Sequence, residues 1–212
     1  LAQAQGKDFI AQYGVMFEPV ISETPPCFAD PFLLNWRSRA QIPVELCLDT
    51  FRRGKITCSF ISGAQIDPYG NLNSVVIGDH DRPKVRLTGP IAQADHAAYA
   101  GRTYILLPHE RRVFVKKVDF ISALGYGNGP GFREQLGLPG GGPAKVITTK
   151  AVLGFDPKSK RMRLESVHPG TTVEEVIANT GFELLVPDRV PETLPPTAKE
   201  LELIRTQIDP NG

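Results

Sequence analysis

The pattern of apolar and polar positions predicts one strand around which the rest of the chain is organised. Residues 56–61 form a mainly apolar, β-branched run, which is typical of a strand buried inside a sheet. Just before it, residues 43–54 place apolar positions on one side of a helix that begins at Pro43 and ends at Gly54. A helix that leads directly into a buried strand is typical of strand, helix, strand units with a parallel sheet.

The same pattern predicts further elements along the chain. Short extended runs, a helix of small residues and two more strands follow the central strand, at residues 75–79, 84–87, 92–100, 104–107 and 113–115. An antiparallel β-meander and two helices come next, at residues 145–149, 151–155, 162–167, 171–181 and 195–205. We therefore predict an α/β fold with an open, mostly parallel, doubly wound sheet that carries an antiparallel β extension.

A polar segment follows the central strand and contains a β-turn at residues 67–70. Asp67, Pro68 and Gly70 are the residue types that such turns favour at these positions. The carboxyl end of a parallel strand faces the crevice in which open α/β sheets bind ligands. The segment brings small residues and amides to this place: Gly63, Ala64, Gln65, Asn71 and Asn73. We therefore predict a site for a ligand that carries a carbonyl or phosphate group.

Composition and charge exclude several classes of function. Lys and Arg number 24 against 23 Asp and Glu, so the net charge of +1 creates no global field that attracts nucleic acid or a membrane surface. The three cysteines, Cys27, Cys47 and Cys58, are far apart, which argues against a disulfide framework or a zinc site. No apolar run is long enough to span a membrane. We expect a cytoplasmic protein that binds no metal, nucleic acid or membrane.

Several longer motifs stand in order along the chain and carry a resemblance. They are Gly63-Ala64-Gln65-Ile66-Asp67-Pro68-Tyr69-Gly70-Asn71, Ile77-Gly78-Asp79, His109-Glu110-Arg111-Arg112, Gly129-Pro130-Gly131, Leu136-Gly137-Leu138-Pro139-Gly140, Thr180-Gly181-Phe182 and Ile208-Asp209-Pro210. In this order they resemble the β subunits of the class I coenzyme A transferases, most closely those of the glutaconate type. The resemblance covers nearly the whole chain.

This resemblance implies a fold, a substrate and a partner. It implies one domain of the CoA-transferase β-subunit (NagB-like) type over residues 1–212, without the strand and helix that precede this point in the family. The substrate would be a coenzyme A thioester such as a glutaconyl-CoA, with no permanently bound cofactor. An α subunit would complete the active site in a heterodimer or α2β2 assembly. Backbone N–H groups of Gly63 and Ala64 would hold the thioester carbonyl, while amides would orient the pantetheine or acyl group: Gln65, Asn71 and Asn73.

The resemblance also singles out Gln12. In the family, a strand at this position ends in Glu-x-Gly, and the glutamate attacks the acyl-CoA thioester. This chain has Gln12, with Gly14 two positions later, at the end of a strand predicted for residues 7–13. A carboxamide is a very poor nucleophile because its lone pair is delocalised. We therefore expect Gln12 to bind the acyl group or a water in an enzyme that decarboxylates or hydrolyses an acyl-CoA.

Other interpretations of this position stay open. With a different alignment register, Glu18 or Glu23 would supply the carboxylate of a conventional CoA-transferase. Gln12 would alternatively be a structural amide, with the active residues elsewhere, including on the partner subunit. A non-catalytic acyl-CoA-binding module that keeps the fold is a further alternative.

Three more segments allow both a functional and a structural interpretation. The proline- and aromatic-rich residues 17–43 either roof an acyl pocket or pack as a loop, and the glycine-rich residues 125–143 form either a flap or an ordered loop. Residues 90–94 depart from the glycine-rich loop that the family carries there, which weakens the expectation of close backbone contacts with CoA. His109 and His168 each follow a strand, where a lone histidine is more often a structural hydrogen-bonding group than a base.

Overall fold

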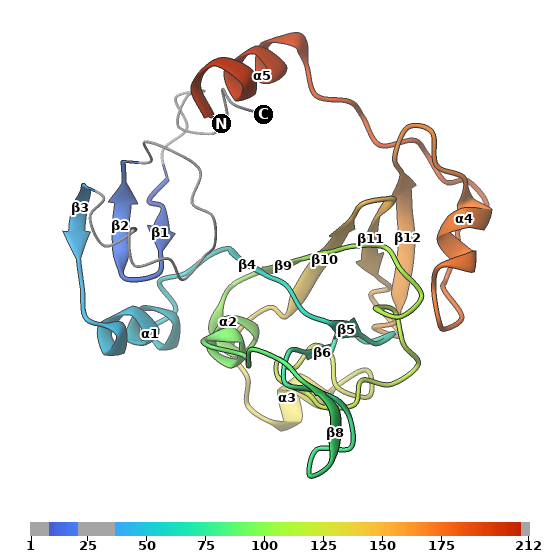
Figure 1. Cartoon of the computed structure of the whole chain (residues 1–212), viewed down its shortest axis with the longest axis horizontal. Helices are drawn as coiled ribbons and strands as arrows, with labels where there is room; N and C mark the ends of the chain where they lie inside the picture. The colour runs from blue at the N-terminus through green and yellow to red at the C-terminus, as the bar shows by residue number, and fades with distance from the viewer. Residues whose placement is uncertain (1–8, 21–36, 209–212) are drawn as a thin grey trace. The chain divides into compact units, whose positions relative to one another are not determined.

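The computed structural model describes residues 9–20 and 37–208, which belong to two compact units (Figure 1). The first unit comprises Leu1–Cys47 and Leu194–Gly212, and the second comprises Leu48–Thr193. The prediction of a single domain stays a prediction. No helix in the described part of the chain is long and apolar enough to cross a membrane.

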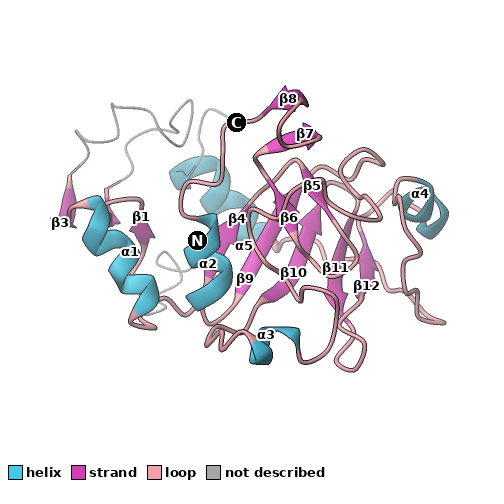
Figure 2. Ribbon diagram, turned by 90° about the horizontal axis from the view of Figure 1, so that it is seen from below, coloured by secondary structure: helices cyan, strands magenta, loops and turns pink. Residues whose placement is uncertain are grey.

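The second unit is built on a five-stranded sheet with the strand order β12-β11-β10-β9-β4 (Figure 2). Strand β9 (Thr103–Leu107) lies between β4 (Ser59–Ile61) and β10 (Pro143–Thr148), and both of these pairings are parallel. Strands β11 (Ala151–Phe155) and β12 (Met162–Val167) extend the sheet with antiparallel pairings. The predicted α/β fold, with a parallel part and an antiparallel meander beside it, is confirmed.

The strand alternation decides which side chains enter the core. In β9, Ile105 and Leu107 are buried, whereas Leu106 between them is 44% exposed, because successive side chains point to opposite faces of a sheet. Helices α2 (Gln93–Tyr99) and α4 (Val173–Ala178) add apolar residues to this same core. Helix α4 begins as predicted with a capping box, in which Thr172 and Glu175 bond reciprocally to each other's backbone N–H groups.

Two hairpins follow β4 and carry the predicted site. Strands β5 (Gln65–Ile66) and β6 (Leu72–Asn73) enclose the predicted β-turn, in which Gly70 N–H donates to the Asp67 carbonyl at 3.0 Å. Strands β7 (Val76–Gly78) and β8 (Pro83–Arg86) form the second hairpin.

The strand predicted at residues 113–115 is only a single bridge between Phe114 and Ile66. The carbonyl of Val113 and the N–H of Val115 both bond to Ile66. Strand β5 is two residues long, so the ladder has no further partner and ends after this bridge.

The glycine-rich stretch is an ordered loop that is held by one buried cation. Arg133, in the short helix α3 (Phe132–Gln135), is 5% exposed. Its guanidinium donates to the backbone carbonyls of Leu124, Gly125, Ala97 and Gly140 at 2.8–3.2 Å. Burial lowers the pKa of Arg133, and the four carbonyls replace the water that the cation loses. The interpretation as an ordered loop therefore fits better than that of a flap.

The first unit contains a small antiparallel sheet with the order β1-β2-β3, made of Gln12–Tyr13, Met16–Pro19 and Ser38–Gln41. The strand predicted for residues 7–13 is therefore shorter, and Lys7 lies outside the described residues. Gly14 does not end an isolated strand but turns the chain between β1 and β2. Its φ of +54° suits the first position of a two-residue hairpin loop.

Three helical elements complete the description. Helix α1 (Val44–Arg52) forms as predicted, but its buried face is narrower: Cys47 and Phe51 are buried, whereas Val44 is 58% exposed. Near the C-terminus, α5 (Ala198–Leu203) is followed by a π-helical turn (Ile204–Ile208).

Candidate functional site

The turn after β4 exposes one backbone donor. Gly63 N–H has no hydrogen-bond partner in the part of the chain that the structure describes, whereas Ala64 N–H donates to the Asn73 carbonyl at 2.8 Å. A Cβ at Gly63 would lie 3.2 Å from that same carbonyl oxygen, closer than a side chain tolerates without a small shift. Of the two predicted carbonyl-binding groups, Gly63 is thus available and Ala64 is used to hold the turn together.

The predicted amides Gln65 and Asn73 are buried and bond to each other. Asn73 donates through Nδ2 to Gln65 Oε1 at 2.7 Å, and its own Oδ1 accepts from Val75 N–H at 2.9 Å. Gln65 Nε2 donates to the Asp119 carboxylate at 3.0 Å, which also accepts from Gly78 N–H at 2.9 Å. The bonds that the structure shows therefore join β5, β6 and β7 behind Gly63. Direct ligand contact by these two amides stays a prediction.

Asn71, the third predicted amide, is 2% exposed and joins the β-turn to the glycine-rich loop. Its Nδ2 donates to Asp67 and to the Gly127 carbonyl at 2.8 Å each, and its Oδ1 accepts from Gly125 N–H at 2.9 Å. Burial raises the pKa of Asp67, while hydrogen bonds from Asn71 and from the Tyr69 backbone favour its charged form. In this structure Asn71 stabilises the loop, and a ligand-binding role for it stays a prediction.

Gln93 is a residue at this site that the sequence patterns did not indicate. Its Nε2 donates to the Ser62 carbonyl at 2.7 Å, and its Oε1 accepts from the hydroxyl groups of Ser74 at 2.9 Å and Ser122 at 3.3 Å. It thereby ties the first turn of α2 to the residue before Gly63. The one available signal was the departure of residues 90–94 from the family's glycine-rich loop.

Gln12 lies in the first unit, where it bonds to groups of the same unit. Its Nε2 is 3.2 Å from the Gly14 carbonyl oxygen and 3.1 Å from Cys47 Sγ, and that thiol is 3.1 Å from the same carbonyl oxygen. Burial raises the pKa of Cys47, and the hydrogen bond from Gln12 acts in the opposite direction. A thiol that stays protonated is a weak nucleophile, so the structure gives no activated Cys47 beside Gln12.

The two alternative carboxylates differ in what is known of them. Glu18 lies in β2, and its carboxylate is 3.7 Å from the guanidinium of Arg39 in the neighbouring strand. Its φ of +49° is unusual for a residue with a side chain. Glu23, together with Cys27 and the aromatic residues Phe28, Phe32 and Trp36, lies outside the described residues.

The two predicted structural histidines are bonded inside the second unit. His109 is 1% exposed and lies between the hydroxyls of Thr148 (Nδ1, 3.0 Å) and Thr180 (Nε2, 3.2 Å). Burial lowers the pKa of His109 to about 4. His168 bonds to Thr193 and to the Thr148 carbonyl. Among the described residues, no group of three or more His, Cys, Asp or Glu side chains could hold a metal ion.

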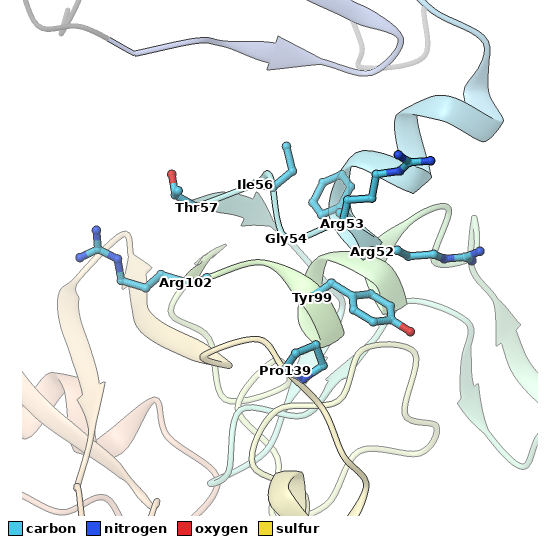
Figure 3. A pocket seen from close by; sticks show the side chains of 10 residues that line it. Arg52, Arg53, Gly54, Ile56, Thr57, Tyr99, Arg102 and Pro139 are labelled. Atoms are coloured by element: carbon cyan, nitrogen blue, oxygen red, sulfur yellow. The ribbon is translucent and has the colours of Figure 1, made fainter.

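A cavity of about 510 Å³ lies at the opposite ends of the parallel strands. Its walls include Ile56, Tyr99 and Pro139, with arginines at its rim (Figure 3). Residues 56–57 precede β4 and residues 101–102 precede β9, whereas Gly63 follows β4. Arg52 pairs with Asp95, and Arg53 pairs with Asp49, so two of the cations at the rim are already neutralised. The cavity is therefore separate from the turn that carries Gly63.

Comparison with known proteins gives a consistent family. Residues 37–179 match the family model for coenzyme A transferase. The chain is 48% identical over 153 residues to the β subunit of the glutaconate CoA-transferase of Acidaminococcus fermentans, covering 72% of this chain and 57% of that protein. It is 33% identical over 152 residues to the cholesterol ring-cleaving hydrolase IpdB subunit of Mycobacterium tuberculosis, with 70% and 58% covered. The chain thus spans somewhat more than half the length of these relatives.

Among solved structures, the glutaconate coenzyme A-transferase of Acidaminococcus fermentans is similar with a TM-score of 0.82 and 37% sequence identity. The similarity covers 93% of this chain and 77% of that chain. The second unit holds most of the residues that match the family model, including the turn with Gly63.

Proposed function

Because the chain belongs to the coenzyme A transferase family, we propose that it is one subunit of an enzyme that acts on an acyl-CoA thioester. The N–H of Gly63, which no group in the described residues accepts, carries this proposal at the level of the site. It follows a parallel strand of the sheet, in a turn that Asn73, Gln65 and Asp119 hold in place. A fixed donor of this kind is suited to bind a carbonyl oxygen that gains negative charge during thioester cleavage.

The roles within this turn divide between donor and support. Gly63 N–H would bond to the thioester oxygen, and Ala64 would hold the turn through its bond to the Asn73 carbonyl. Gln65, Asn71 and Asn73 would act mainly by keeping the turn rigid, because their amides already have buried partners. Pre-organised donors gain most when they need no rearrangement during the reaction.

The reaction that we propose is cleavage without a glutamyl intermediate. Gln12 stands where the resembled transferases carry their attacking glutamate, and a carboxamide does not attack a thioester at a useful rate. Gln12 would instead donate a hydrogen bond to the acyl group or a water. Water attack on the thioester carbonyl would release the acid and CoA. A relative that is 33% identical is named as a hydrolase, which supports this assignment over a transferase. Decarboxylation of the acyl group is the alternative for an acyl-CoA that carries a free carboxylate.

The partner and the substrate are proposed with the same activity. The curated relatives are named as subunits, so we propose an α subunit as the partner, in a heterodimer or an α2β2 assembly. Coenzyme A enters as part of the substrate. A conventional transferase that uses Glu18 or Glu23 remains the second candidate.

The test is to trap the acyl-enzyme in the native complex of the full-length protein. After incubation with acyl-CoA, borohydride reduces a glutamyl-CoA thioester to an alcohol, which mass spectrometry detects. We expect free CoA to form without a reduced glutamate in the wild type. The variant Gln12→Glu should become trappable at position 12, and Gln135→Glu, on the exposed side of α3, is the matched control. A reduced Glu18 or Glu23 in the wild type would establish the transferase instead. Acyl-CoA binding without any turnover would indicate a non-catalytic module.

A further inference from the structure

The loop between β8 and α2 holds one residue in an unfavourable conformation. Ile91 has a φ of +47°, and its side chain is 77% exposed. A β-branched residue rarely adopts a left-handed conformation, because its side chain crowds the backbone. Such a residue persists only where the surrounding structure imposes the conformation, and sites of this kind concentrate where ligands bind.

The contacts that impose this conformation lie on both sides of Ile91. Gly89 N–H donates to the Ser74 carbonyl at 2.9 Å, and Gln93 N–H donates to the Pro90 carbonyl at 2.8 Å. The side chain of Gln93 then bonds to the Ser62 carbonyl and to the Ser74 hydroxyl. The loop is therefore fixed at both ends to the two segments that flank the β5–β6 hairpin.

These contacts place Ile91 beside the proposed thioester site. Gln93 bonds directly to Ser62, the residue before Gly63, and Ile91 is two residues from Gln93, a separation of at most about 8 Å between Cα atoms. Within the second unit, an apolar and exposed side chain is thus presented next to the N–H donor of Gly63. A polar residue at this position would lose nothing by being exposed, whereas isoleucine gains only if something apolar covers it.

We propose that Ile91 is a specificity-determining residue that contacts the apolar acyl chain of the substrate, and that Gln93 is the positioning residue that holds it there. This inference rests on the proposed function. The substrate class would be acyl-CoA thioesters whose acyl group continues as an apolar chain beyond the carbonyl. The acyl chain is the variable part of such thioesters, so a contact with it changes the preference among substrates, whereas a contact with the common pantetheine would not.

The first experiment removes the apolar side chain without opposing the backbone. In Ile91→Asn, asparagine tolerates the left-handed conformation, so the variant should fold at least as well as the wild type. Binding and turnover of acetyl-, butyryl- and hexanoyl-CoA are measured with the native complex. We expect the preference for hexanoyl-CoA over acetyl-CoA in kcat/KM to fall about tenfold, with little change for acetyl-CoA. Ile177→Asn, at a 47% exposed position in α4, is the matched control and should leave the preference intact.

The second experiment tests the positioning role of Gln93. In Gln93→Glu the carboxylate still accepts from Ser74 and Ser122, but it repels the Ser62 carbonyl in place of donating to it. We expect kcat/KM to fall about tenfold for all three thioesters, and the hexanoyl preference to shrink as in Ile91→Asn. A purely structural role would lower the unfolding midpoint and the active fraction but leave KM and the preference unchanged. Gln135→Glu again serves as the control.

The outcomes separate this inference from the proposed function. If the wild type turns over the thioesters but Ile91→Asn keeps the wild-type preference, the specificity role of Ile91 is wrong and the proposed function stands. An equal loss of affinity for all three thioesters in Ile91→Asn would also overturn it, because that result indicates contact with pantetheine. If the wild type neither binds nor cleaves any of them, the proposed function fails and this inference fails with it.

Discussion

His109 should make the stability of the second unit depend on pH in a defined range. Its ring is buried between the hydroxyls of Thr148 and Thr180 and stacks on Phe114 with ring centroids 4.4 Å apart. Burial lowers its pKa from 6.5 to about 4, and the positive charge of Lys150 acts in the same direction. The folded protein therefore binds the proton more weakly than the unfolded chain does.

The sign and the size of the effect follow from this difference. Between pH 6.5 and about 4 the unfolded chain takes up a proton at His109 that the folded protein does not. The contribution of the neutral ring to stability is fully present above pH 6.5 and is lost as the pH falls toward 4. Each pKa unit corresponds to about 1.4 kcal/mol, so the loss amounts to about 3 kcal/mol over this range.

The measurement compares the free energy of unfolding of the wild type and of His109→Gln across this pH range. Urea unfolding followed by circular dichroism gives both values, and the carboxylates titrate alike in the two proteins. The advantage of the wild type should therefore shrink by about 3 kcal/mol between neutral pH and pH 4. His80→Gln, at an exposed histidine, should keep the wild-type dependence. If the difference between wild type and His109→Gln stays constant with pH, the ring is not held neutral by burial.

Three further predictions concern the scaffold of the site, and unfolding free energies test all of them. Arg133→Leu should destabilise the second unit by about 3 kcal/mol or more, because four backbone carbonyls lose a buried donor; a loss below about 1 kcal/mol would show that water replaces the guanidinium. Gly127→Ala should be much more harmful than Gly137→Ala: both have a φ above +60°, but a Cβ at Gly127 would lie 2.0 Å from Phe132, while no atom lies near one at Gly137 among the described residues. Equal effects would mean that Phe132 moves away freely. Thr172→Ala should cost about 1 kcal/mol through loss of the capping box of α4, and an unchanged stability would show that the cap is dispensable.

The elements that local sequence determines were predictable. The helix Val44–Arg52, the central strand and the β-turn at Asp67 follow from proline, glycine and apolar periodicity, which act over a few residues. The β-meander follows in the same way from alternation. The strand predicted at residues 113–115 was wrong because a strand needs a partner of its own length, and Ile66 offers only one bridge.

The direction of polar side chains was decided only by the tertiary structure. The sequence by itself placed Gln65, Asn71 and Asn73 beside Gly63, but it did not show that Asp119 and Gly127, more than fifty residues away in the chain, satisfy the amides of Gln65 and Asn71. Gln93 was missed for the same reason, since an isolated glutamine carries no local pattern and gains its role from contacts with Ser62 and Ser122. Backbone propensities act between neighbours along the chain, whereas a buried amide takes whichever donor or acceptor the fold brings within about 3 Å of it.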